Sequence, residues 1–119
     1  MAIKLKRAYE VPESGDGFRV LVDRLWPRGV SRSSARIDLW LKEIAPSTAL
    51  RKWFGHEPLK WAKFRERYFA ELDHNPEAVE QLRAHVYQGM VTLVYGAKDR
   101  EHNHAVALKE YLENLERHS

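Results

Sequence analysis

The apolar run at residues 90–95 limits the fold of this chain more than any other segment. It reads Met-Val-Thr-Leu-Val-Tyr, which is typical of a strand that is covered on both faces. A second run, Phe-Arg-Val-Leu-Val at residues 18–22, follows a strong turn signal at residues 14–17. We therefore predict that Val20–Val22 and Val91–Val94 form the buried centre of a sheet.

Two weaker patterns predict further strands. Apolar and basic residues alternate over residues 3–6, and apolar and polar residues alternate over residues 37–42. A helical continuation is the alternative for the second of these segments. The link between residues 3–6 and residues 18–22 looks too short for a parallel crossover, which favours an antiparallel pair.

Apolar residues spaced three and four apart predict four helices. Ser47 can cap the first, Pro58 suits the first turn of the second, Asn75–Pro76 opens the third, which Gly89 ends, and Asp99 can cap the last. The inward positions are Leu50, Trp53 and Phe54, then Trp61, Phe64, Tyr68 and Leu72, then Val79, Leu82 and Val86, and finally Ala105, Leu108, Leu112 and Leu115. Strands that alternate with helices predict one small α/β domain, with a mixed or mostly parallel sheet of about four strands covered by helices.

Composition excludes several classes of protein. The 119 residues leave room for one domain and no second core. The chain has no Cys, which excludes disulfides, thiolate metal sites and a Cys nucleophile. No signal peptide is visible, and no apolar stretch approaches the ~20 residues that span a bilayer. We expect a soluble, cytoplasmic protein that does not bind membranes.

Positive charge is concentrated in the first third of the chain. Residues 1–36 hold eight Lys and Arg against four Asp and Glu, whereas residues 37–119 hold twelve against thirteen. This excess would suit an anionic partner, and a solvated surface is the alternative.

The first candidate site segment is residues 23–29, directly after a predicted strand, where α/β sheets usually bind ligands. Arg24 and Arg28 offer forked donors for a carboxylate or a phosphate, and Trp26 can stack on a ligand ring. The structural alternative is a tight loop in which Asp23 pairs with an arginine and Trp26 fills the core.

The second candidate segment is residues 98–104, after the other buried strand. Lys98 adds positive charge, and Asp99, His102 and Asn103 supply groups that hold a ligand or move a proton. His102 and His104 do not share a helix face, and no His-Glu-x-x-His motif is present, so we predict no metal site and no cofactor.

A third group lies at residues 45–56. Ser47 suits a helix cap better than a ligand contact, and Gly55–His56 suits either a helix C-cap or a pocket wall. The chain has neither a Gly-rich phosphate loop nor a Gly-x-Ser-x-Gly nucleophile elbow, so common nucleotide hydrolases and α/β-hydrolases are unsupported.

Three segments read together resemble a known family. They are Leu21-Val22-Asp23-Arg24-Leu25-Trp26-Pro27-Arg28-Gly29; Ala45-Pro46-Ser47 through Leu50-Arg51-Lys52-Trp53-Phe54, His56, Pro58, Trp61, Phe64 and Arg67-Tyr68 to Glu71-Leu72; and Thr92-Leu93-Val94-Tyr95-Gly96-Ala97-Lys98-Asp99 with His102-Asn103. In order and spacing these resemble the YeaO-like bacterial proteins, within domain of unknown function 488, over nearly the whole chain. Arg32 departs from the Lys expected there and keeps the charge. The resemblance implies a small cytosolic α/β protein and carries no established activity.

Two hypotheses follow from these segments. In the first, a binding or catalytic site for a small molecule, the two strands end side by side and in parallel, so that Arg24, Arg28 and Lys98 hold a phosphate or carboxylate. Trp26 and Asn103 then contact the ligand, and Asp99 or His102 handles a proton. The alternative is a nucleic-acid-binding or regulatory module that uses Trp26 for stacking and a set of basic residues against phosphates: Lys4, Lys6, Arg7, Arg28, Arg32 and Arg36. The sequence leaves the oligomeric state open.

Overall fold

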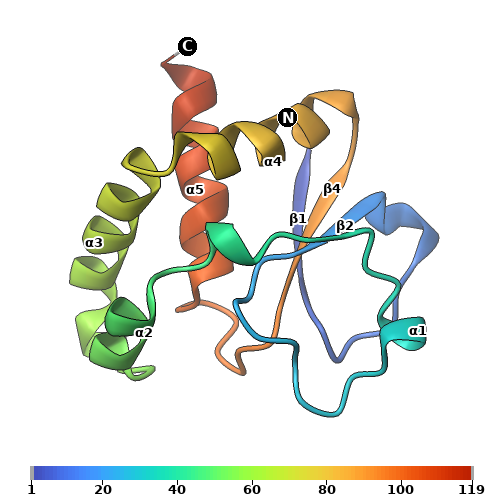
Figure 1. The fold of residues 1–119 in the computed structure, drawn as a ribbon, viewed down its shortest axis with the longest axis horizontal. Helices are drawn as coiled ribbons and strands as arrows, with labels where there is room; N and C mark the ends of the chain where they lie inside the picture. The colour runs from blue at the N-terminus through green and yellow to red at the C-terminus, as the bar shows by residue number, and fades with distance from the viewer. Residues whose placement is uncertain (1, 119) are drawn as a thin grey trace.

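Within residues 2–118, four strands run parallel in one sheet in the order β1–β4–β2–β3, and Figure 1 shows β1, β4 and β2 side by side. The computed structural model describes residues 2–118. The strands are β1 (Ile3–Arg7), β2 (Phe18–Leu21), β3 (Leu39–Trp40) and β4 (Val91–Tyr95). The predicted α/β class is confirmed, and the sheet is wholly parallel.

The predicted antiparallel pairing of the first two strands is wrong. β4 lies between β1 and β2, and Val91 is in register with Ile3 on one side and with Phe18 on the other, both in parallel. The prediction assumed that strands adjacent in the chain are neighbours in the sheet. β4 takes the central place instead because all five of its residues are buried, which requires neighbours on both edges and cover on both faces.

The four longer helices lie on the same side of the sheet (Figure 1). They are α2 (Thr48–Phe54), α3 (Trp61–Asp73), α4 (Pro76–Gln88) and α5 (His104–Arg117). The main core forms between them and the sheet, and the predicted centre is confirmed, since Val20, Val22, Val91 and Leu93 have no exposed surface.

A smaller apolar cluster covers the opposite face. There Leu21 and Val94 pack against Trp26, Ile37 and Trp40, which lie in or beside the segment between β2 and β3. That segment contains only a one-turn helix, α1 (Arg32–Ala35). A long loop therefore covers this face, in place of the helices that cover the other.

Short 3-10 turns complete the fold: η1 (Ser14–Asp16), η2 (Lys42–Ile44) and η3 (Pro58–Lys60). Pro58 therefore begins a 3-10 turn that leads into α3, rather than the α-helix itself. The cap predicted at Ser47 is confirmed, because its hydroxyl accepts a hydrogen bond from the backbone N–H of Leu50.

The cap predicted at Asp99 for the last helix is wrong. α5 begins at His104, and its N-cap is Asn103, whose Oδ1 accepts from the N–H of Val106 at 3.0 Å. The Asp99 carboxylate accepts instead from the backbone N–H groups of Glu101 and His102, at 2.9 and 3.0 Å. It thereby closes a turn ahead of the helix, and these hydrogen bonds hold the pKa of Asp99 below its usual value.

A buried ionic cluster ties β1 and β2 to η1. The fully buried carboxylate of Asp16 contacts Lys6 at 3.1 Å and Arg19 at 2.6 Å, and the more exposed Lys4 at 3.1 Å. Glu13 also pairs with Lys6, at 2.6 Å. Burial alone would raise the pKa of Asp16, but hydrogen bonds from the Glu13 backbone and the three cations hold it far below the usual range.

Within residues 2–118, no helix is long and apolar enough to cross a membrane.

Candidate functional site

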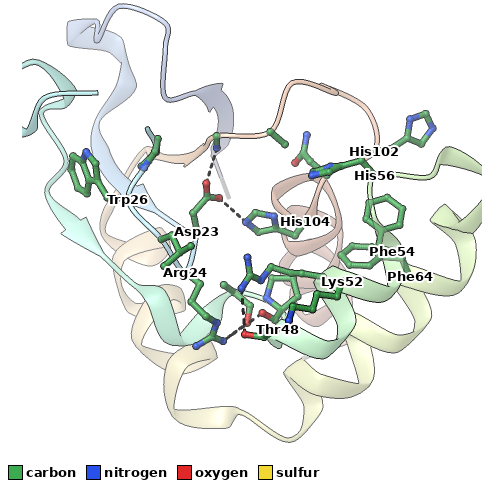
Figure 2. Close-up of a pocket in the computed structure, with 18 of the residues that line it drawn as sticks. Asp23, Arg24, Trp26, Thr48, Lys52, Phe54, His56, Phe64, His102 and His104 are labelled. Carbon is green, nitrogen blue, oxygen red and sulfur yellow. Dashed lines mark hydrogen bonds and ion pairs between the residues drawn. The ribbon is translucent and has the colours of Figure 1, made fainter. Parts of the chain in front are cut away.

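The strands β2 and β4 end side by side, and a side chain joins their ends. Asp23, two residues after β2, accepts a hydrogen bond through Oδ2 from the backbone N–H of Gly96 at 2.9 Å (Figure 2). A Cβ atom at Gly96 would lie 2.9 Å from that same oxygen. Only glycine therefore allows the carboxylate to approach the backbone this closely.

His104, in the first turn of α5, completes this junction. Its Nε2 donates to the carbonyl of Val22 at 3.1 Å and lies 3.0 Å from Oδ1 of Asp23. Both neighbours are acceptors, so Nε2 must carry a proton. The imidazole also meets the ring of the buried Tyr68 edge-on, and His104 is therefore held by contacts on more than one side.

A cavity of about 630 Å³ opens beside this junction. Figure 2 shows Asp23 and His104 at one side of it, with Phe54, Phe64 and His102 at another. The walls come from the segments after β2 and β4, from the start of α5, and from the region of α2 and α3. The lining residues are Tyr9, Asp23, Arg24, Leu25, Trp26, Pro27, Ala45, Pro46, Thr48, Arg51, Lys52, Phe54, His56, Phe64, Gly96, Ala97, His102, Asn103 and His104.

Positive charge predominates in this lining. Arg24, Arg51 and Lys52 face one carboxylate, Asp23, which leaves two positive charges in excess when the histidines are neutral. Asp23 accepts from Gly96 through Oδ2, while its buried Oδ1 lies 3.0 Å from His104 and accepts no hydrogen bond within residues 2–118. It makes no ion pair with these cations. The alternative in which Asp23 pairs with an arginine is therefore not what the structure shows.

The two guanidinium groups have unused donors. Arg24 donates through Nη2 to the carbonyl of Ala45 at 3.2 Å, and Arg51 donates through Nη2 to Oγ1 of Thr48 at 3.3 Å. The Nε atom of each is buried and has no hydrogen-bond partner within residues 2–118. A third such Nε, that of Arg83 on α4, lies away from the cavity. Buried donors without a partner are rare in folded proteins, and two of these three belong to side chains that line the cavity.

Part of the cavity lining is apolar. The buried rings of Phe54 and Phe64 stack at 4.4 Å between centroids. His56 follows the C-cap of α2 and has a left-handed backbone, with φ of 58°. It lines the cavity, as one of the two interpretations of Gly55–His56 predicted, and Gly55 serves as the cap that the other predicted.

The structure brings some of the predicted site residues together and leaves others outside. Arg24, Trp26, His102 and Asn103 line the cavity. Three others do not line it: Arg28, Lys98 and Asp99. Arg28 and Lys98 are exposed. The carboxylate of Asp99 accepts from backbone N–H groups of its own turn, and its Oδ2 lies 2.9 Å from Nδ1 of His102.

Structural contacts already occupy most of the residues that do line it. Trp26 donates to the carbonyl of Val30 at 2.7 Å and meets Trp40 edge-on at 5.4 Å between centroids. Asn103 is 2% exposed. Its Oδ1 caps α5, and its Nδ2 donates to the carbonyl of Asp99. Arg24 is the predicted ligand-binding residue with an unused buried donor.

Sequence reasoning missed four residues of this site: Asp23 as the strand junction, His104 as its partner, and Arg51 and Lys52. The last two lie on α2, which the helix analysis treated only as a source of apolar contacts. Their adjacency at the end of a short helix next to Gly55–His56 was the available signal. His104 carried no signal of its own, because its contact with Asp23 spans 81 residues of sequence.

The hydroxyl groups of the cavity lining have no neighbouring base. Two hydroxyl groups line the cavity, those of Tyr9 and Thr48, and neither bonds an imidazole or a carboxylate. Within residues 2–118, no three His, Cys, Asp or Glu side chains are grouped to hold a metal ion.

Comparison with known proteins places this chain in a family. Residues 2–119 match the family described as the inactive DUF488-N3 subclade. The uncharacterised protein YeaO of Escherichia coli K12 is 44% identical over 97% of this chain and 100% of its own length. Uncharacterised proteins of Mycobacterium bovis and Mycobacterium tuberculosis are each 37% identical over 92% of both chains. No solved structure matches. The chain therefore belongs to the DUF488 proteins, in the branch described as inactive.

Proposed function

We propose that this protein binds a small anionic molecule, carrying a phosphate or a carboxylate, in the cavity at the ends of β2 and β4. One observation carries the proposal: Arg24, Arg51 and Lys52 line that cavity against the single carboxylate of Asp23, and the buried Nε of each arginine has no hydrogen-bond partner within residues 2–118. A carboxylate or phosphate oxygen is the acceptor that a guanidinium fork fits best. The excess of positive charge around these two groups supports the same class of ligand.

Binding without turnover is the form of this function that the geometry favours. Nucleophilic catalysis by a hydroxyl needs a base within reach, and the hydroxyls of Tyr9 and Thr48 have no such base. The description of the family as an inactive subclade supports the same choice. The protein would then act as a cytoplasmic sensor or carrier of its ligand. Proton transfer by His102 is the remaining catalytic hypothesis. Measured turnover of the ligand that binds would support it.

A thermal-shift screen against phosphorylated and carboxylated metabolites tests the proposal. A ligand at ~100 times its dissociation constant adds about 2.7 kcal/mol to the free energy of unfolding, which is readily detected. Each ligand found in this way is then titrated into the Arg24→Ala variant and into the Arg28→Ala variant, and the dissociation constants are compared. Both variants remove an arginine from the same loop, but Arg28 is exposed and lies outside the cavity.

We expect Arg24→Ala to weaken binding by about tenfold or more, in line with the loss of a charged hydrogen bond, and Arg28→Ala to leave it unchanged. Equal effects would show that binding occurs outside the cavity. If Arg24→Ala lowers stability but leaves affinity intact, the contacts of Arg24 with Ala45 and Pro46 are its whole role.

Nucleic-acid binding has less support as the alternative. Of the basic residues assigned to it, Lys4 and Lys6 are held by Asp16, and Arg32 lies over the ring of Trp26 at 4.5 Å. The hypothesis predicts affinity for DNA or RNA that falls steeply between ~50 and ~200 mM salt. Fluorescence anisotropy with labelled single- and double-stranded oligonucleotides at low salt tests it, and absence of binding there would reject it.

A further inference from the structure

The cavity lining combines cationic side chains with aromatic rings, and each kind of group restricts the ligand. Arg24, Arg51 and Lys52 bring three positive charges, against the single carboxylate of Asp23. The stacked rings of Phe54 and Phe64 form an apolar wall in the same cavity. We infer that the ligand is an organic phosphate monoester whose apolar, preferably aromatic, body lies on that wall. This inference rests on the proposed function and narrows its ligand class.

The charge of the cavity favours a dianion. Its two excess positive charges would be half matched by a carboxylate, whereas a phosphate monoester carries about −2 at neutral pH and offers three acceptor oxygens. Three oxygens also suit the donors present, because Arg24 and Arg51 line the cavity from different elements. One carboxylate has only two oxygens to share between two guanidinium groups and an ammonium group.

The volume and walls of the cavity favour a body attached to the phosphate. About 630 Å³ falls within the range typical of sites for drug-sized ligands and far exceeds what inorganic phosphate fills. Pro27, Ala45 and Pro46 add further apolar groups to the lining. Burying an apolar body there releases water from both surfaces and adds affinity that the anion alone lacks.

Glu71 does not offset this charge. Its carboxylate accepts from the backbone N–H of Ser47 at 2.8 Å and from the hydroxyl of Ser47 at 2.6 Å, and Glu71 does not line the cavity. The histidines of the lining, His56, His102 and His104, add positive charge if they are protonated and none if they are neutral. Neither case reduces the excess.

Four probes separate the two ends of the ligand: phenyl phosphate, inorganic phosphate, benzoate and phenol. Each is titrated into the full chain at pH 7.5 by calorimetry, while the backbone amide resonances of Gly96 and Ala97 report binding at the cavity. We expect phenyl phosphate to bind at least about tenfold more tightly than each of the other three, because it alone has both the dianion and the ring. Lys52→Gln should weaken phenyl phosphate several-fold and change benzoate less, with Arg28→Gln as the unchanged control.

The outcomes separate this inference from the proposed function. If benzoate or inorganic phosphate binds as tightly as phenyl phosphate at the cavity, the cavity takes anions but the monoester assignment is wrong. If phenol binds as tightly, the charged end is not used, and both conclusions fall. If no probe moves the Gly96 and Ala97 resonances at millimolar concentration, the cavity is not an anion site, and the proposed function is rejected with the inference.

Discussion

The Asp23 carboxylate accepts the backbone N–H of Gly96 at 2.9 Å, and in this way a side chain continues the pairing of β2 and β4 beyond the last residue of the sheet ladder. Gly96→Ala should disrupt this junction, since the new Cβ would lie 2.9 Å from Asp23 Oδ2. We expect a loss of about 1–3 kcal/mol in the free energy of unfolding, the usual range for overpacking. Urea denaturation measures it.

Gly15→Ala is the matched control for that variant. A Cβ at Gly15 has no atom within 4 Å, and its φ lies outside the left-handed region. Its unfolding free energy should stay within about 0.5 kcal/mol of wild type. If both variants lose equal stability, the close approach of Asp23 to Gly96 is not the cause.

Leu93, at the centre of β4, tests the buried centre of the sheet. It has no exposed surface, so Leu93→Ala should cost about 2–5 kcal/mol. Leu59→Ala removes the same atoms from a side chain that is 97% exposed and should change stability by less than about 0.5 kcal/mol. A loss below that value for Leu93→Ala in chemical denaturation would show that the strand is peripheral.

Asp16 should make stability depend on acidity. Its folded-state pKa lies far below its unfolded value, so the stabilisation is complete above the unfolded pKa near 4 and is lost as the pH falls further. At pH 7, Asp16→Asn should cost about 3–5 kcal/mol, because Arg19 remains buried without its counter-charge and Lys6 keeps only the exposed Glu13.

The difference in unfolding free energy between wild type and Asp16→Asn should therefore shrink as the pH is lowered from 5 towards 2. Guanidinium denaturation at a series of pH values measures this difference. A difference that stays constant over that range would mean that Asp16 contributes by packing and not by charge.

The start of α5 provides a test of the corrected helix cap. Asn103→Ala removes the oxygen that accepts the N–H of Val106 and leaves a nearly buried site, so we expect a loss of about 0.5–2 kcal/mol. Asn103→Asp keeps the accepting oxygen and should recover most of that loss. Thermal unfolding followed by circular dichroism compares the two. Equal stability of both variants would show that the amide's donation to Asp99, and not the cap, is what matters.

The sequence was informative wherever one segment determines its own structure. The continuous apolar runs correctly located β2 and β4, because burial on both faces leaves no alternation, and Ser47 and Gly89 marked helix ends correctly. The cap of α5 was misplaced because Asp99 and Asn103 both suit that role, and only the path of the backbone decides between them.

Contacts between distant segments could not be read in this way. Only residues 8–17 link β1 to β2. The length of that link does not reveal that β4, 70 residues further along the chain, inserts between the two strands. In the candidate site, Arg24 and Arg28 have the same side chain in the same loop, yet only Arg24 lines the cavity. Arg51 and Lys52 reach it only because α2 packs near the strand ends.

The place of β4 between β1 and β2 also bears on how the chain matures during synthesis. A ribosome releases β1 and β2 early, but β1 has no sheet partner until residues 91–95 emerge, and β2 has only the two-residue β3. The apolar side chains of β1 and β2 therefore lack their shared neighbour, β4, until nearly the whole chain has been synthesised. Completion of translation, rather than any local hairpin, is therefore the event that allows this sheet to close.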